Sequence, residues 1–216
     1  MFRISAHRIL GRTAMVALIG VILLAGVASG EVTIPKPAGI EIPAKLPQLK
    51  GPVAITTIGQ APGASWVNVL LKGLKIPSTM EDMLSPNDLV AASKNPSTAF
   101  KTLVLTMGTS GKGMGGAGVD IDAEIARCNA LVTQAKKLGI FVVGAQIEGA
   151  ARRTDQGDER SNKVVSSQSD LLIVRKEVDG DAFFTNAAKQ RNIPIIRTVE
   201  SLDFKYAFAV LFNSGK

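Results

Sequence analysis

The residues best placed for chemistry lie in one glycine-rich stretch, GTSGKGMGGAG, which spans residues 108–118. Six of its eleven residues are glycine, and Ser110 and Lys112 add a hydroxyl and a positive charge. Consecutive backbone amides in such a stretch can form a concavity that binds anions. Together with Thr109 and Gly113, these residues predict a site for an oxyanion or another polar ligand. A Ser–Lys nucleophile pair is an alternative that no second feature supports.

Two familiar phosphate-binding templates fit this stretch poorly. A P-loop requires G-x-x-x-x-G-K-[ST], but Thr106 stands at its first glycine and Gly113 follows the lysine. The dinucleotide fingerprint G-x-G-x-x-G is matched by Gly113, Gly115 and Gly118, but five residues separate it from the preceding strand-like run. The acid expected about 20 residues beyond that fingerprint is also missing, since Leu138 stands there. We therefore expect no cofactor.

An acidic helix start follows the glycine-rich stretch and weakens the anion-binding interpretation. Asp120 suits a helix N-cap, and Asp122 and Glu124 lie in the first turn, where the helix dipole favours negative charge. In the alternative, the glycines only permit a tight loop, Lys112 offsets the carboxylates and nothing binds. Asp120 and Asp122 could also contribute oxygen ligands to Ca²⁺, but the full calcium-loop pattern is absent. We expect no metal site.

The elements that must position these residues alternate regularly after residue 52. Strand-like runs alternate with glycine-bearing loops and helix-like segments, which indicates a parallel sheet covered on both faces. We therefore expect a three-layer, doubly wound, mostly parallel sheet of five to six strands, flavodoxin-like or Rossmann-like. The expected strands are 53–58, a short one within 78–83, 102–107, 140–147, 170–176 and 194–199, and the expected helices are 66–74, one capped by Ser85 with Pro86 at its first position, 120–138, 158–168, 182–192 and one beginning at Ser201.

The order of these elements places the glycine-rich stretch at a predicted binding crevice. In open parallel sheets, ligands bind beyond the carboxyl ends of the strands, where the strand order reverses. In a flavodoxin-like order, that point lies between the strands at 53–58 and 102–107. The loop after the first strand, GQAPGAS, contributes Gln60 and Ser65, although Ser65 could simply cap a helix. Two glycine-bearing loops should therefore converge there.

A third group follows the expected strand at 140–147. Glu148, Arg152 and Arg153 come directly after it, and an arginine pair can clamp a carboxylate or phosphate through paired hydrogen bonds. In the alternative, both arginines are solvated or ion-paired. The complete predicted ligand-binding set is Gln60, Ser65, Thr109, Ser110, Lys112, Gly113, Glu148 and Arg152.

Histidine and cysteine usage excludes several kinds of site. The only histidine is His7, so the chain beyond it cannot form a Ser-His-Asp or Cys-His catalytic group or a metal site that needs imidazole. The only cysteine is Cys128, which rules out an internal disulfide. We expect Cys128 to pack in the core, since it belongs to a helical series of apolar residues, Ile121, Ile125, Cys128, Val132 and Ala135.

The N-terminus predicts export. Arginines at positions 3, 8 and 12 precede an apolar run over 14–27, and Ala28-Ser29-Gly30 resembles a cleavage site. We interpret residues 1–30 as a signal peptide, with an uncleaved anchor as the alternative. The protein would then be periplasmic or extracellular. Without these three arginines the net charge falls from +7 to +4, and no basic stripe remains, so we expect no nucleic-acid partner. We also expect no membrane insertion of the mature domain.

A proline-rich segment separates the predicted signal from the domain. Residues 31–52 contain five prolines, which disfavour a helix and favour an extended backbone. We interpret this segment as a linker, with an arm packed along the domain surface as the alternative. Residues 53–216 then form a single α/β domain. Its last helix is aromatic, which predicts a lid over the core or, alternatively, a partner surface.

Four segments of the chain resemble one uncharacterised family. They are TTIGQ at 56–60, KTLVLTMGTSGKGMGGAGVD at 101–120, GAARR at 149–153 and DLLIV at 170–174. The family is a domain of unknown function in secreted prokaryotic proteins, in which a signal peptide precedes one α/β domain with a G-x-S-K-G-x-G-x-A-G-x-D-like loop. The likeness covers roughly residues 52–199, and Gly111 is an insertion relative to that loop. The resemblance implies the fold and export, and it assigns no catalytic residue.

These observations together predict an exported protein that binds a small polar or anionic ligand at the carboxyl edge of a parallel sheet. The first alternative is a histidine-independent hydrolase or transferase that uses carboxylates, with or without a divalent cation. The second is an accessory partner of a membrane or surface complex, which would bind through the aromatic C-terminal helix.

Overall fold

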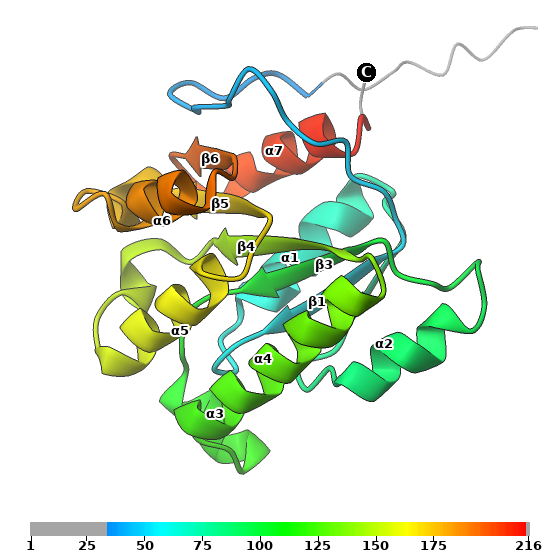
Figure 1. The fold of residues 1–216 in the computed structure, drawn as a ribbon. Helices are drawn as coiled ribbons and strands as arrows, with labels where there is room; N and C mark the ends of the chain where they lie inside the picture. The colour runs from blue at the N-terminus through cyan, green and yellow to red at the C-terminus, as the bar shows by residue number, and fades with distance from the viewer. Residues whose placement is uncertain (1–33, 215–216) are drawn as a thin grey trace, which may run out of the picture. The chain divides into compact units, whose positions relative to one another are not determined.

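A computed structural model of the chain describes residues 34–214, which belong to one compact unit (Figure 1). The predicted signal peptide, residues 1–30, lies outside the described residues. No helix within 34–214 has both the length and the apolar character that a membrane span requires.

The centre of the domain is a six-stranded sheet in which every pairing is parallel. Its strand order is β2-β1-β3-β4-β5-β6, so the chain reverses direction across the sheet between β1 and β3. The inner strands are mostly apolar and buried along nearly their whole length, because both faces of the sheet are covered. The predicted doubly wound, flavodoxin-like arrangement is confirmed. The strands are β1 Val53–Thr57, β2 Ser78–Met80, β3 Thr102–Thr106, β4 Phe141–Gln146, β5 Leu171–Arg175 and β6 Ile195–Thr198.

Helices cover both faces of the sheet (Figure 1). One core lies between the sheet and the pair α1 and α7, and the other lies between the sheet and α2, α4, α5 and α6. The α-helices are α1 Gly63–Gly73, α2 Pro86–Ser93, α3 Gly111–Ala117, α4 Ile121–Lys137, α5 Gln156–Ser166, α6 Phe183–Arg191 and α7 Phe204–Leu211, and the 3₁₀ helices are η1 Gly149–Arg152, η2 Lys176–Val178 and η3 Ser201–Asp203.

The helix starts follow the capping residues in the sequence. Ser85 caps α2 in a reciprocal capping box with Asp88, and Asp120 accepts a hydrogen bond from the Ala123 amide at 2.8 Å at the start of α4. Along α4, Cys128 is completely buried, as its helical spacing predicts.

The aromatic C-terminal helix packs into the core. Phe204 and Phe208 of α7 are fully buried against the sheet and α1. This arrangement favours the core-lid interpretation over an aromatic partner surface.

The described part of the proline-rich segment, residues 34–52, is a packed arm. Glu41 and Arg197 exchange backbone hydrogen bonds of 2.8 and 3.0 Å, so the arm adds an antiparallel bridge to the edge strand β6. Ile40 and Leu49 are buried in the α1–α7 core. The linker prediction is therefore wrong for these residues, because apolar side chains between the prolines bury against the domain.

The glycine-rich stretch also differs from the expected loop. Residues 111–117 form the helix α3, because Ser110 caps its start and Gly118 ends it with a left-handed φ of 68°. Only a glycine fits at position 113, since a side-chain carbon there would overlap the carbonyl oxygen of Gln60. Gly113 thus allows this short helix to approach Gln60 closely, and the stretch is not an open loop.

Candidate functional site

Two regions at the carboxyl edge of the sheet could hold a ligand. The first is the predicted crevice between the ends of β1 and β3, formed by residues 59–63 and 107–113, which we call the glycine-rich crevice. The second is a pocket between α1 and η3, which we call the α1–η3 pocket.

The two segments of the glycine-rich crevice are pinned directly to each other. Gln60 and Thr109 form an antiparallel bridge, and the Ser110 amide donates to the Gly59 carbonyl at 2.7 Å. Gly59 and Gly108 have φ values of 95° and 110°, which a side chain would strain, so glycine is required for this close approach. The loops converge at the switch point as predicted, but they contact each other rather than enclosing a space.

A buried ion pair fills the β1 side of the crevice. Glu124 of α4 is fully buried and accepts hydrogen bonds from the Gly59 amide at 2.9 Å and from the Gln60 side chain at 2.8 Å. Arg127 binds the same carboxylate through two contacts of 2.8 and 2.9 Å. Burial alone would raise the pKa of Glu124, but the hydrogen bonds from Arg127 and Gly59 outweigh it, so the pKa is lowered.

A second carboxylate fills the β3 side of the crevice. Asp158 of α5 is buried and accepts hydrogen bonds of 2.8 Å from both the amide and the hydroxyl of Thr109. The neighbouring Gly108 amide donates to Ser161 at 2.9 Å, and the Gly113 amide donates to the Ser110 hydroxyl at 3.1 Å. The amides of residues 108–110 and 113 are therefore occupied by groups of the protein itself.

The third group, after β4, is also internally paired. Glu148 accepts from the Gly63 amide and from Arg152 Nε, both at 2.9 Å. Arg153 forms ion pairs with both Glu159 and Asp181. The hydrogen bonds to Glu159 and, to a smaller extent, to Asp181 raise the pKa of its guanidinium. The two arginines therefore do not form a joint clamp, because Arg153 is saturated by these partners.

The remaining predicted residues lie at the surface. Lys112 is exposed on α3 and forms no ion pair among residues 34–214. Ser65 is exposed within α1 and does not cap it, because Pro62 occupies the N-cap position. Asp122 pairs with Arg160 on the surface. Within the described part of the chain, no group of three or more histidine, cysteine, aspartate or glutamate residues is arranged to hold a metal ion.

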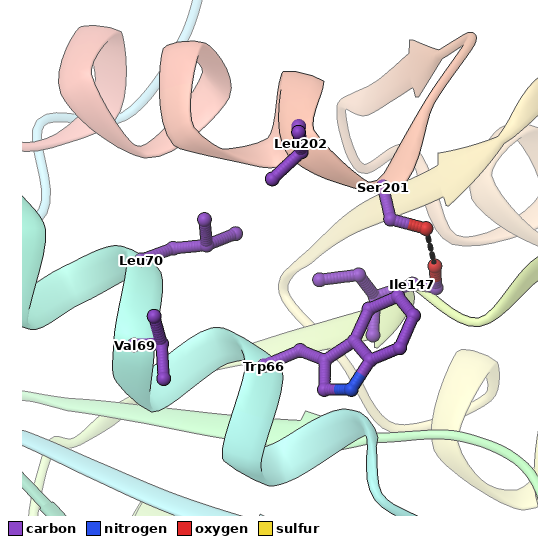
Figure 2. Close-up of a pocket in the computed structure, with 6 residues that line it drawn as sticks. All are labelled: Trp66, Val69, Leu70, Ile147, Ser201 and Leu202. Carbon is purple, nitrogen blue, oxygen red and sulfur yellow. Dashed lines mark hydrogen bonds between the residues drawn. The ribbon is translucent and has the colours of Figure 1, made fainter.

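The α1–η3 pocket was missed by sequence reasoning (Figure 2). Its volume is about 390 Å³. Leu202 is 76% exposed, Val69 67% and Trp66 47%, unusually high fractions for large apolar side chains. Figure 2 shows Trp66, Val69 and Leu70 on α1 across from Ser201 and Leu202 on η3. The lining is almost entirely apolar and consists of Trp66, Val69, Leu70, Ile147, Ser201 and Leu202.

The α1–η3 pocket lies at the same edge of the sheet as the glycine-rich crevice. Ile147 directly follows β4, and Ser201 opens η3 after β6. The Ser201 hydroxyl donates to the Ile147 carbonyl at 2.7 Å, which fixes η3 across the end of β4 (Figure 2). The sequence held one signal for this pocket. Helix α1 is apolar over more of its circumference than core packing needs, since Val67 and Leu71 already form its buried face.

None of the pockets described among residues 34–214 is lined by both segments of the glycine-rich crevice. The crevice segments instead contact each other and the buried carboxylates Glu124 and Asp158.

The chain belongs to a family described as a domain of unknown function (DUF6305), whose model matches residues 50–212. The predicted resemblance to an uncharacterised domain family is confirmed at this level. No curated protein matches the chain.

Several solved structures match the chain at low identity and low TM-score. A GDSL-like lipase from Bacteroides thetaiotaomicron is 11% identical with a TM-score of 0.34, and the match covers 67% of this chain and 66% of the lipase. TesA is 13% identical with a TM-score of 0.34, over 67% of this chain and 77% of TesA. The psychrotrophic esterase EstA from Pseudoalteromonas sp. is 10% identical with a TM-score of 0.32, and the match covers 74% of this chain and 92% of EstA. The chain spans less than two thirds of the lipase's length, and matches of this strength carry no information on activity.

Proposed function

We propose that this DUF6305 domain is an exported protein that binds a small molecule in the α1–η3 pocket. The ligand places an apolar part in the pocket and keeps the polar or anionic group predicted from the sequence at its rim. The site remains at the carboxyl edge of the sheet, where ligands of open parallel folds bind.

The open apolar pocket is the observation that carries this proposal. Its volume of about 390 Å³ lies in the range of small-molecule sites, roughly 300–1,000 Å³. Trp66, Val69 and Leu202 expose apolar surface that the fold does not bury. A bound apolar group would remove that surface from water, which is the main favourable contribution to such binding.

The glycine-rich crevice is the weaker candidate because it would have to give up internal partners. An incoming anion at Gly59 or Thr109 would have to displace Glu124 or Asp158 from 2.8–2.9 Å hydrogen bonds. Displacing Glu124 would also leave Arg127 buried without its counter-ion, which is costly.

The lone tryptophan of the chain, Trp66, gives a direct test of pocket occupancy. We expect titration with octanol to shift its fluorescence emission to shorter wavelength as the indole leaves water. Leu202→Glu places a charge at the pocket and should abolish the shift. The matched control is Val90→Glu on α2, which changes another exposed apolar residue and should leave it intact. The same response in the two variants, or none in the native protein, would refute the proposal.

Export is supported by the basic, apolar and small-residue pattern of residues 1–30. The test is the intact mass of the protein recovered from outside the cytoplasm of an expressing bacterium. A mature chain beginning at Glu31 is expected. A chain retained in the cytoplasm with Met1 intact would contradict export.

A further inference from the structure

The Glu148–Arg152 pair begins directly after Ile147, which lines the α1–η3 pocket. A side-chain carbon added at Gly63 would lie 3.0 Å from Glu148 Oε1 and 3.1 Å from Ile147 Cγ2, so the carboxylate and a pocket-lining side chain approach the same point. Gly63 also lies three residues before Trp66 on α1, which is about one helical turn. The Glu148 carboxylate therefore lies at the first turn of α1, near the pocket-lining Ile147.

Arg152 is held in place by contacts that do not involve its outer nitrogens, Nη1 and Nη2. Its aliphatic stem packs over Gly108, where a side chain would overlap it, and its Nε donates to Glu148 at 2.9 Å. Among residues 34–214, no hydrogen bond involves Arg152 Nη1 or Nη2. By contrast, the outer nitrogens of Arg127 and Arg153 all donate to carboxylates or carbonyls.

The remaining donors of Arg152 suit a planar anion. A guanidinium carries five N–H groups, and the two outer nitrogens form a fork that matches a carboxylate. The Arg152 side chain is 25% exposed, so part of it contacts solvent. Among the described residues, Glu148 contacts Arg152 only through Nε and accepts its other hydrogen bond from the Gly63 amide, so it does not engage the fork.

We infer that Arg152 forms an anion subsite at the rim of the α1–η3 pocket, and that the ligand is an amphiphilic carboxylate. This inference rests on the proposed function, because the apolar part of the ligand occupies that pocket. The carboxylate accepts hydrogen bonds from Nη1 and Nη2, and Glu148 orients the guanidinium through Nε. No covalent step is involved.

The test compares octanoate with octanol, which share an apolar chain and differ in the carboxylate, by Trp66 fluorescence. Native protein should bind octanoate about 10-fold more tightly than octanol, the scale of a charge-assisted hydrogen bond. Arg152→Gln should remove that preference and leave octanol binding unchanged. The octanol response also shows that the variant is folded. If Arg152→Gln does not fold, Arg152→Lys takes its place and should lose most of the preference, because it keeps the charge without the fork.

Lys72→Gln is the matched control, since Lys72 is an exposed cation on α1 outside the subsite. It should keep the octanoate preference, which separates a direct contact from a general effect of net charge. Equal affinity of native protein for both probes, or a preference lost in Lys72→Gln and kept in the Arg152 variants, would overturn the subsite and leave the pocket proposal standing. Failure of both probes to shift Trp66 in native protein would overturn the pocket proposal itself.

Discussion

The glycine-rich crevice and the α1–η3 pocket lie at one edge of the same sheet. They differ in that the polar groups of the crevice have partners within the protein, whereas the apolar side chains of the pocket are left exposed. In the crevice, the Gly59 and Thr109 amides are bound by the buried carboxylates Glu124 and Asp158. In the pocket, Trp66 and Leu202 remain exposed with no core to join. The comparison shows that glycines and charged residues indicate a binding site only when their hydrogen-bond donors have no partner within the protein.

The two regions should therefore respond differently to substitution. Changes in the crevice should mainly affect the free energy of unfolding, because its polar groups hold α4 and α5 to the strand ends. Changes in the pocket should mainly affect ligand binding. Four predictions test this division.

The largest effect is expected for Glu124→Ala. The change leaves Arg127 buried without its counter-ion and removes the acceptor of the Gly59 amide. We expect the free energy of unfolding to fall by roughly 3–5 kcal/mol, as when one partner of a buried ion pair is removed. Denaturant unfolding measures this change.

Asp122→Ala is the matched control for Glu124→Ala, since it breaks the exposed pair with Arg160 on the same helix. It should cost about 1 kcal/mol or less. Equal losses in the two variants would show that the crevice carboxylate has no special structural role.

Alanine at two glycines of α3 should change the free energy of unfolding by smaller amounts and in opposite directions. The pair tests how closely α3 approaches the segment after β1. Gly113→Ala should destabilise by about 1–3 kcal/mol, because the methyl group would overlap the Gln60 carbonyl. Gly115→Ala meets open space in the same helix and should stabilise by roughly 0.5–1 kcal/mol. Thermal and denaturant unfolding of both variants provide the measurement. A Gly113→Ala protein as stable as Gly115→Ala would mean that the crevice is open.

The pH dependence of stability tests the charge on Glu124. Its pKa in the folded protein is lowered, because the Arg127 and Gly59 hydrogen bonds outweigh burial. The charge therefore contributes stability above the unfolded-state pKa, about 4.3, and this contribution is lost as the pH falls through the lower folded value. Native protein should exceed Glu124→Gln in unfolding free energy at neutral pH, with the difference shrinking below about pH 4.3. A difference that stays constant down to strongly acidic pH would contradict the ionised pair.

The smallest stability effect is expected in the pocket. Leu202→Ala should change the free energy of unfolding by less than about 0.5 kcal/mol, since Leu202 is 76% exposed. Leu105→Ala, at a buried leucine of β3, should cost roughly 2–5 kcal/mol. A large cost at Leu202 would show that η3 is part of the core and not a pocket wall.

Local patterns in the sequence predict most of the fold. Alternating strands and helices, the Ser85 and Asp120 caps and the buried spacing around Cys128 depend on near neighbours in the chain, and the structure contains them all. The position of the switch point between β1 and β3 follows from the same alternation.

The closure of the crevice could not be predicted because it depends on distant residues. Glu124 lies 65 residues from Gly59, and Asp158 lies 49 residues from Thr109. The sequence predicts that Glu124 interacts with the dipole of its own helix, whereas in the structure its side chain binds Gly59 and Gln60 after β1. The α1–η3 pocket likewise needs residues from α1, the end of β4 and η3.

Heteronuclear NMR of the mature domain during an octanoate titration compares the two regions most directly. We predict that the Trp66 indole and Leu202 amide signals shift in proportion to occupancy, while the Gly59 amide, which is bound by Glu124, stays unchanged. A shift of the Gly59 amide, with Trp66 and Leu202 unaffected, would contradict the account and place the ligand in the glycine-rich crevice.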